Sequence, residues 1–296
     1  MILKEMDAAR RLLVAFAHPD DESFGPAGTI IHYARQGVAV HYACATRGEV
    51  GDVDPELLAG YDSLAELRTR ELECAAGHLG LAGLHLLGYR DSGMENSPHN
   101  AHPDSLFQAP LEEVAARIVT LIRQIRPQVV ITFDPSGGTF HPDHVRMHQA
   151  TVLAFHAAGD PARFPWQLDE GLVPYCPQKL YYTAFPRELV KFVVKLMPLL
   201  GQDPAAVGRN RDMDLKRIAA VDQVVTAKIR ITPYLEASQR AARCHASQAI
   251  GGQHGFPAFV RRWLFRFDTF TRAVPVVEDG RLEYDLFAGI EGESKP

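Results

Sequence analysis

Hydrophobic residues in the first half of the chain form short continuous runs, separated by segments with helical spacing. The continuous runs lie at residues 12–17, 38–45, 84–87 and 128–133. Short apolar runs of this kind are typical of strands that are covered on both faces of a sheet. The pattern therefore predicts four strands in this half of the chain.

Three segments between these runs carry apolar residues at helical spacing. Helices are expected at residues 27–36, from Asp62 or Ser63 to Leu79, and at 111–125. Gly37, Gly80 and Pro127 follow their ends, as is common where helices stop. Alternating strands and helices favour an α/β fold with a Rossmann-like, mostly parallel sheet flanked by helices.

The second half of the chain has a weaker pattern. Residues 180–182 favour a further strand, 189–200 a buried amphipathic helix, and 215–248 a long helix that is interrupted near Pro233. Stretches rich in proline and small polar residues predict loops at 91–110 and 157–177.

Composition and charge narrow the class of protein. The chain has 296 residues, of which 46% are hydrophobic and 23% charged, which is ordinary for a globular domain. We expect residues 1–296 to form a single domain, with a core over about 11–185 and a C-terminal elaboration of helices and strands over about 186–296. The net charge of −5 counts against nucleic acid as a partner. No apolar stretch is long enough to span a membrane.

The N-terminal segment and the cysteines favour a cytoplasmic protein. Residues 1–11 are polar and lack the apolar core of a signal peptide. The four cysteines have no paired spacing, so we expect neither a structural zinc site nor a disulfide framework, and reduced thiols are typical of the cytoplasm. They are Cys44, Cys74, Cys176 and Cys244. The oligomeric state stays open, a homo-oligomer included.

Two polar clusters follow the first and the fourth predicted strands. The first reads Ala-His-Pro-Asp-Asp-Glu at 17–22, and the second reads His-Pro-Asp-His at 141–144. Open α/β sheets bind ligands at the carboxyl ends of their strands, and in the common order 3-2-1-4 the first and fourth strands are neighbours. We therefore expect the two clusters to share one site.

The side chains of these clusters suit metal-assisted hydrolysis. His18, Asp21 and His144 supply two nitrogens and a carboxylate, which leaves a coordination position open for water. Asp20, beside a ligand, is the candidate general base. His141 is the candidate that stabilises the oxyanion or protonates the leaving amine.

A His-Pro-Asp tripeptide alone is more often a turn before a helix. Two such clusters at strand ends favour a metal centre, because burying imidazoles and carboxylates together without a cation is unfavourable. Asp143 is expected to orient His141 or another histidine from behind the site. The ligand set suits zinc and ferrous iron alike.

The two motifs resemble those of the LmbE-like, or PIG-L, family of metal-dependent N-acetylglucosamine deacetylases. The resemblance spans roughly residues 11–250. Weaker similarities include two that resemble the mycothiol-pathway branch, at 137–138 and 245–248. The others lie at 46–49, 66–71 and 90–94.

The resemblance implies a Rossmann-like sheet and a zinc ion, or ferrous iron, bound by His18, Asp21 and His144. It implies that Asp20 is the base and His141 the electrophilic partner. The expected enzyme is a zinc-dependent hydrolase that removes the N-acetyl group from a small N-acetylglucosamine conjugate, so its partner is a small amino-sugar substrate.

Three further residues are candidates for substrate binding. Arg47, Arg68 and Asp91 are placed to hold sugar hydroxyls or an acidic aglycone, although surface salt bridges explain the arginines nearly as well. Two alternative functions remain: an amidase that acts on mycothiol conjugates with the same site, and a catalytically silent sugar-binding protein of this fold. Intact Asp20 and His141 count against the silent protein.

Overall fold

The computed structural model describes residues 10–184, 187–207, 214–248, 266–277 and 280–290. Most of the polar N-terminal segment, residues 1–9, lies outside these ranges. No helix within the described ranges is both long and apolar enough to cross a membrane.

The described strands form one sheet. They are β1 (Arg11–Phe16), β2 (Ala39–Cys44), β3 (Gly83–Leu86), β4 (Val129–Thr132), β5 (Lys179–Ala184), β6 (Ala227–Arg230) and β7 (Phe267–Val274). Their order in the sheet is β3-β2-β1-β4-β5-β7-β6. Neighbours among β1 to β5 run parallel, whereas β7 is antiparallel to β5 and β6. The predicted α/β class and the 3-2-1-4 order are confirmed.

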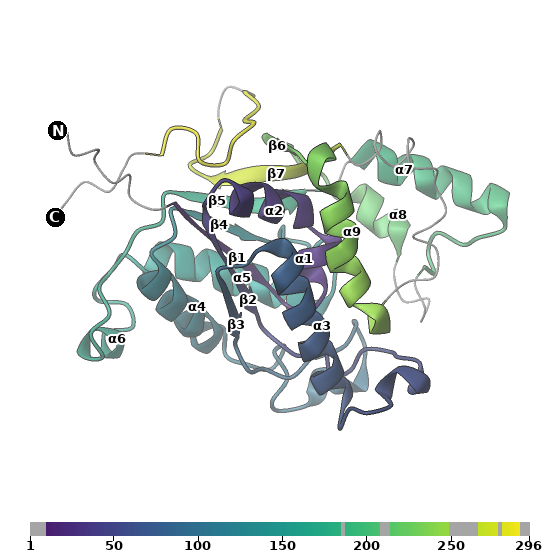
Figure 1. Ribbon diagram of the computed structural model, residues 1–296, viewed down its shortest axis with the longest axis horizontal. Coiled ribbons are helices and arrows are strands. Elements are labelled where there is room, and N and C mark those ends of the chain that lie inside the picture. Colours follow the sequence, from purple (N-terminus) through teal and green to yellow (C-terminus); the bar gives the residue numbers. More distant parts are fainter. Residues whose placement is uncertain (1–9, 185–186, 208–213, 249–265, 278–279, 291–296) are drawn as a thin grey trace.

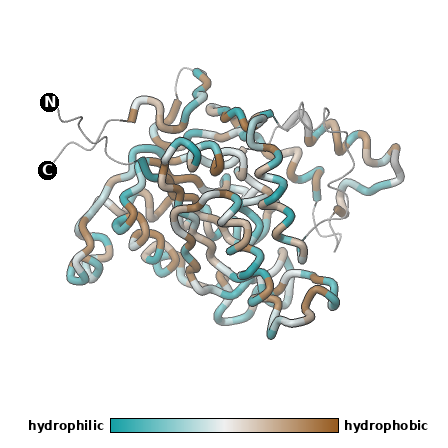
Figure 2. The backbone as a smooth tube through the Cα atoms, viewed as in Figure 1, coloured by the Kyte–Doolittle hydropathy of each residue, from teal (hydrophilic) through white to brown (hydrophobic). Residues whose placement is uncertain are grey.

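Helices cover both faces of this sheet. They are α1 (Asp21–Phe24), α2 (Ala27–Arg35), α3 (Leu64–Leu79), α4 (Leu111–Ile125), α5 (Pro142–Ala157), α6 (Trp166–Asp169), α7 (Arg187–Leu196), α8 (Leu215–Ala220) and α9 (Leu235–Cys244). Figure 1 shows α4 and α5 side by side on one face, and α1, α2, α3 and α9 grouped on the other. Hydrophobic and hydrophilic residues alternate along α4 in Figure 2, as expected of a helix that buries one side. Short 3₁₀ turns lie at 55–58, 98–101, 197–200, 232–234 and 246–248.

Local sequence signals account for the first-half elements. The side chains of β1 from Leu12 to Phe16 are almost fully buried, as the continuous apolar run predicts. Ser63 caps α3 by accepting a hydrogen bond from the Glu66 amide at 3.2 Å. Gly80 ends the same helix in the left-handed conformation, with φ of 74°. The predicted loops at 91–110 and 157–177 are confirmed apart from one 3₁₀ turn and the one-turn α6.

Two predictions for the second half are wrong. The long helix predicted at 215–248 is instead α8, β6 and α9. In β6 the side chains of Ala227 and Ile229 are buried and that of Arg230 is exposed, but a four-residue alternation is too short to stand out among helix-forming neighbours. The helix predicted at 189–200 exists as α7 but is not buried, since the Phe192 side chain is 62% exposed.

The cysteine prediction is also wrong. Cys74 of α3 and Cys244 of α9 form a disulfide across 170 residues of sequence, whereas Cys44 and Cys176 are free. Sequence spacing gives no sign of this bond, because the two cysteines meet only through the packing of α9 on α3. The bond therefore ties the C-terminal elaboration to the core.

The disulfide is expected to contribute to stability. Because it closes a loop of this length in the unfolded chain, replacing both cysteines (Cys74→Ser with Cys244→Ser) is expected to lower the free energy of unfolding by about 2–4 kcal/mol. Urea unfolding of the oxidised protein measures the change, with Cys176→Ser as the matched control. Equal stability of the double variant and the control would contradict the prediction.

A second link joins the elaboration to the core. The Asp268 carboxylate of β7 accepts hydrogen bonds from the Thr29 amide and hydroxyl, both at 2.8 Å, in the first turn of α2. The N-cap residue of α2, Pro26, provides no side-chain bond. Asp268 therefore caps a core helix from a distant strand. The division into a core and an elaboration within one domain stays a prediction.

This capping carboxyl is expected to make stability depend on pH. Burial raises the pKa of Asp268 to about 6, although its bonds to Thr29 act in the other direction. Because the folded protein holds this proton more tightly than the unfolded chain, the stabilisation is complete below about pH 4 and is lost as pH rises through 6. Between pH 5 and 7, the unfolding free energy of the wild type is expected to fall by about 1 kcal/mol more than that of Asp268→Asn. A wild-type-to-variant difference that stays constant in urea unfolding across this range would refute the assignment.

Candidate metal centre

The first motif forms the loop between β1 and α1. The Asp21 carboxylate folds back on this loop, where its Oδ2 accepts hydrogen bonds from the amides of Ala17 (3.2 Å) and His18 (2.7 Å). These bonds hold the side chains of His18 and Asp21 on the same side of the loop. The carboxyl end of β1 therefore presents one imidazole and one carboxylate together.

The second motif forms the N-terminus of α5. His141 is its N-cap residue, and the His141 Nδ1 accepts a hydrogen bond from the Asp143 amide at 3.2 Å. His144 follows in the first turn, and its backbone packs closely against Gly137. A Cβ at Gly137, where φ is +66°, would lie 2.7 Å from the His144 Cβ. Only glycine fits at position 137, which explains the first residue of the Gly137-Gly138 pair.

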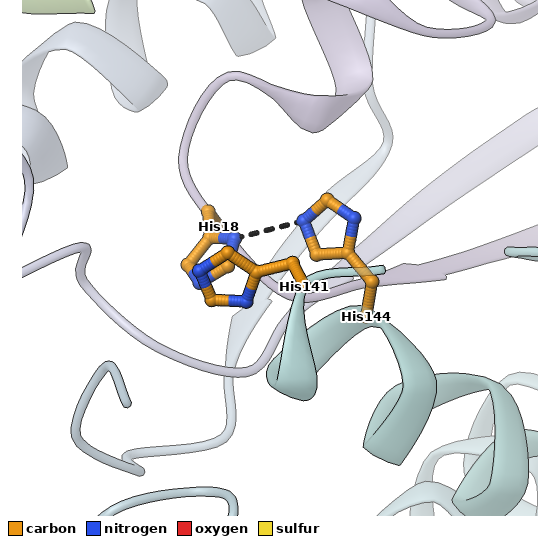
Figure 3. A group of neighbouring side chains, drawn as sticks. All are labelled: His18, His141 and His144. Carbon is orange, nitrogen blue, oxygen red and sulfur yellow. Dashed lines mark hydrogen bonds between the residues drawn. The ribbon is translucent and has the colours of Figure 1, made fainter. Parts of the chain in front are cut away.

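The two motifs meet because β1 and β4 are adjacent parallel strands. His18 Nδ1 lies 3.1 Å from His144 Nε2, and Asp21 oxygens lie 3.7 Å from the first nitrogen and 3.4 Å from the second. Figure 3 shows the rings of His18 and His144 facing each other, with His141 beside them. The two Asp21 distances are to different oxygens, Oδ2 for His18 and Oδ1 for His144. His18, His141 and His144 are three side chains whose ligand atoms lie close enough together to share one ion. Asp21 as the third ligand therefore stays a prediction.

Hydrogen bonds on the far sides of the rings fix their tautomers. His144 Nδ1 donates to the Gly137 carbonyl at 2.9 Å, and His18 Nε2 donates to Asp143 Oδ2 at 3.2 Å. When both rings are neutral, the two facing nitrogens are then both unprotonated, as metal ligands must be. Asp143 thus orients His18, which decides between the two alternatives that the sequence left open.

Asp143 and Asp91 form a buried acidic layer behind His18. Asp143 accepts hydrogen bonds from the Ser92 amide at 2.9 Å and from the Ser92 hydroxyl. Asp91 Oδ1 lies 3.5 Å from His18 Nε2 and accepts from the Gly93 amide at 2.8 Å. Burial opposes a charge on His18, but Asp91 and Asp143 together raise its pKa well above the ordinary value. These carboxylates make the imidazole a stronger ligand.

Burial shifts the pKa of the other site residues in the directions expected for a water-poor cluster. It raises the pKa of Asp20 to about 7 and that of Asp21 to about 6. It lowers the pKa of His144 to about 3 and that of His141 well below its ordinary value. The cluster therefore favours neutral imidazoles at His141 and His144 but a protonated one at His18, and a bound cation would favour neutral His18 and charged carboxylates.

Asp20 lies beside the ligands, held by a buried arginine. Arg68 Nη2 lies 3.0 Å from Asp20 Oδ2 and 2.7 Å from the Pro19 carbonyl, and Arg68 Nη1 donates to the Gly48 carbonyl at 3.1 Å. A Cβ at Gly48, where φ is +66°, would lie 2.1 Å from Arg68 Nη1. The guanidinium of Arg68 therefore packs behind Asp20 and against a glycine that leaves room for it.

The structure brings most of the predicted site residues together. His18, His141 and His144 lie together, and Asp21 contacts His18 and His144. Asp20 lies in the same loop as His18, and the roles of all five residues stay predictions. Three others were predicted to bind substrate, and those roles also stay predictions. Of them, Asp91 is buried against His18, Arg68 is buried behind Asp20, and Arg47 is exposed.

The sequence reasoning missed two parts of the site. Ser92, which holds Asp143, was noted only as part of a weak similarity, and Glu22 received no role although it ends the first motif. Glu22 has no exposed surface and lies 2.6 Å from His245 Nε2. Similarity at 245–248 was the signal for this contact, but nothing in the sequence says which residue His245 meets.

A small hollow opens at Phe140, the residue before His141 in the chain. Its volume is about 140 Å³. Arg217 of α8 forms one wall, where its guanidinium stacks on the Phe140 ring at 3.8 Å and Nη1 lies 2.7 Å from Glu95 Oε2. The other lining residues are Met94, Asn96, Thr139 and Asp214. Both the elaboration and the loops of the core thus border this hollow.

Comparisons with known proteins agree with this geometry. The family model described as PIG-L, GlcNAc-PI de-N-acetylase, matches residues 13–155. A curated relative from Thermobispora bispora is 36% identical over 317 residues, covering 96% of this chain and 99% of the relative. A relative from Kineococcus radiotolerans is 38% identical over 321 residues, covering 99% and 86%. Both are named 1D-myo-inositol 2-acetamido-2-deoxy-alpha-D-glucopyranoside deacetylase.

A solved structure supports the fold. The N,N'-diacetylchitobiose deacetylase from Pyrococcus horikoshii aligns with a TM-score of 0.60 at 22% identity, covering 90% of this chain and 84% of that one. The family of this chain follows from its sequence identity to the curated relatives, which extends over nearly the whole chain. The chain therefore belongs to the PIG-L, or LmbE-like, family and is a hydrolytic N-deacetylase of this metal-dependent group.

Proposed function

We propose that the protein removes the acetyl group from 1D-myo-inositol 2-acetamido-2-deoxy-alpha-D-glucopyranoside, with zinc as its metal. The observation that carries the proposal is the similarity to relatives of that name over 96–99% of the chain. The closeness of His18, His141 and His144, with the Asp21 carboxylate in contact with His18 and His144, supports the zinc assignment, since imidazoles and a carboxylate suit an open zinc site.

The residues of the chain have separate tasks in this reaction. A bound zinc ion would polarise the acetyl carbonyl and lower the pKa of the attacking water. Asp20 accepts the proton of that water, held in place by Arg68. The His141 ring lies beside His18, with ring centroids 4.5 Å apart, and it donates to the oxyanion or to the leaving amine.

The hollow at Phe140 is a suitable place for the inositol part of the substrate. It is lined mainly by polar residues, including Glu95, Asp214 and Arg217, which are donors and acceptors for hydroxyl groups. We propose that it selects the aglycone. The metal site itself contacts only the acetamido group, so selection must come from such neighbouring walls.

Acetate release tests the function. The zinc-loaded wild type is expected to hydrolyse the inositol conjugate with kcat/KM at least about tenfold above N-acetylglucosamine or N,N'-diacetylchitobiose, because only the conjugate fills the hollow. Asp20→Asn is expected to lower kcat by about 10²–10⁴-fold through loss of the base. Asp169→Asn, an exposed change in α6, is the matched control and is expected to keep wild-type activity.

The outcomes separate the alternatives. A preference for diacetylchitobiose would contradict inositol as the aglycone. A preference for a larger amide conjugate would favour the amidase function. Full activity in Asp20→Asn would remove Asp20 from the mechanism.

Metal affinity tests the ligand geometry. Gly137→Ala is expected to displace His144 and to weaken zinc binding by about tenfold or more. Losses of this size are typical when a residue that supports a metal ligand is changed. Titration against a competing chelator gives the dissociation constant, and anaerobic loading with ferrous iron compares the two metals. Gly171→Ala is the matched control, because Gly171 also has a positive φ, of 88°, but open space around it. Equal zinc affinities of the two variants would contradict the prediction that Gly137 supports the position of His144.

We also propose a cytoplasmic location. Cys176 is exposed and free, and an exposed free thiol suits a reducing compartment. Disulfides such as Cys74–Cys244 are more typical of oxidising compartments, so fractionation of cells provides the test. Recovery of the activity outside the cytoplasmic fraction would overturn this proposal.

A further inference from the structure

The main chain of Asp20 has a conformation that a non-glycine residue adopts only under constraint. Its φ is 132° and its ψ is −27°. Such backbone persists only where the surroundings hold it, and it is common at functional sites. One holding group is Arg68, described above. The other is Glu22, whose Oε2 accepts a hydrogen bond from the Asp20 amide at 3.0 Å.

Glu22 depends in turn on a residue from the far end of the chain. Its Oε1 accepts a hydrogen bond from the Ser23 hydroxyl at 2.6 Å and lies 2.6 Å from His245 Nε2. The Glu22 and His245 side chains have no exposed surface. Both Glu22 oxygens are thus engaged, so this carboxylate is not available as a further metal ligand. A buried carboxylate needs such a partner, and His245 is the cation-forming side chain at that distance among the described residues.

The surroundings of His245 favour a functional role for its contact with Glu22. His245 Nδ1 is buried and has no hydrogen-bond partner within the described part of the chain. An unpaired buried nitrogen is unfavourable, so a purely apolar side chain would suit packing better at this position. The one polar contact that the ring makes through a nitrogen, to Glu22, offsets this disadvantage.

The segment that carries His245 is firmly placed against the core. It follows α9, whose last residue, Cys244, is bonded to Cys74 of α3. Two residues after His245, the Ser247 amide and hydroxyl donate hydrogen bonds to the Glu71 carboxylate at 2.8 and 2.6 Å. Because this segment is fixed at both of these contacts, His245 can hold Glu22, and through it Asp20, in a defined position.

We propose that His245 is a positioning residue for deacetylation: through Glu22 it holds the Asp20 main chain and so aims the Asp20 carboxylate at the reacting centre. The inference rests on the proposed function, because it takes Asp20 as the base. Without His245, the bond from Glu22 to the Asp20 amide loses its support, and Asp20 relaxes towards negative φ. A displacement of about 1 Å in a catalytic group reduces turnover by about 10²-fold.

Two substitutions at His245 test the proposal. His245→Leu fills the space but removes the bond, and it is expected to lower kcat by about 10²-fold while KM and the zinc dissociation constant stay within about threefold. His245→Gln keeps an N–H donor that reaches Glu22, and it is expected to recover kcat to within about tenfold of the wild type. Glu22→Gln combined with His245→Leu is expected to lose no more activity than His245→Leu alone, since both act through one contact.

Ser247→Ala is the matched control for anchoring. It removes the hydroxyl bond to Glu71 from the same segment but does not touch residues 20–22. Thermal unfolding is expected to shift in this variant with little change in kcat. If Ser247→Ala lowers kcat as much as His245→Leu does, or if His245→Gln is as slow as His245→Leu, then His245 serves only the folding of the segment and the proposal is wrong.

A crystal structure of His245→Leu separates this inference from the proposed function. Asp20 is expected to leave the positive-φ region in that variant, whatever the substrate. A wild type that releases no acetate would overturn the proposed function, whereas an unchanged Asp20 conformation in an otherwise intact variant would overturn the positioning role of His245.

Discussion

Two imidazole nitrogens that face each other across 3.1 Å, His18 Nδ1 and His144 Nε2, are the contact on which the site depends. Each ring donates its other nitrogen's proton to a fixed acceptor, on Asp143 or the Gly137 carbonyl. While both rings are neutral, these bonds leave an unprotonated nitrogen of each ring facing the other. Two facing lone pairs repel, and a shared cation with the Asp21 carboxylate beside it removes the repulsion.

The fold makes this contact possible through the adjacency of two strands. β1 and β4 run parallel and side by side, so the loops at their carboxyl ends meet although the sequence separates them by more than a hundred residues. Residues from the C-terminal part of the chain pack against the segments next to the first motif. Strand β7 caps α2 through Asp268, and the residue after α9, His245, contacts Glu22.

The sequence predicts well those features that depend on neighbours in the chain. The strands of the first half were visible as apolar runs, and the ligand candidates stood at their ends, where the sheet must bring them together. Contacts that arise from the packing of α9 on α3 and on α1 could not be predicted. Cys74 and Cys244 are 170 residues apart, and Glu22 and His245 are 223 residues apart. No local periodicity encodes either pair.

The sequence also could not predict the direction in which a polar side chain points. Arg68 was a candidate for binding substrate because of its charge, but its guanidinium lies behind Asp20 and bonds to two backbone carbonyls. Asp143 was expected to orient a histidine, and only the folded geometry identifies that histidine as His18. Residue type fixes which chemistry is available, whereas the fold decides which group each side chain holds. In this protein Arg68 and Glu22 both hold Asp20, whose main chain has a positive φ that a non-glycine residue adopts only under such constraint.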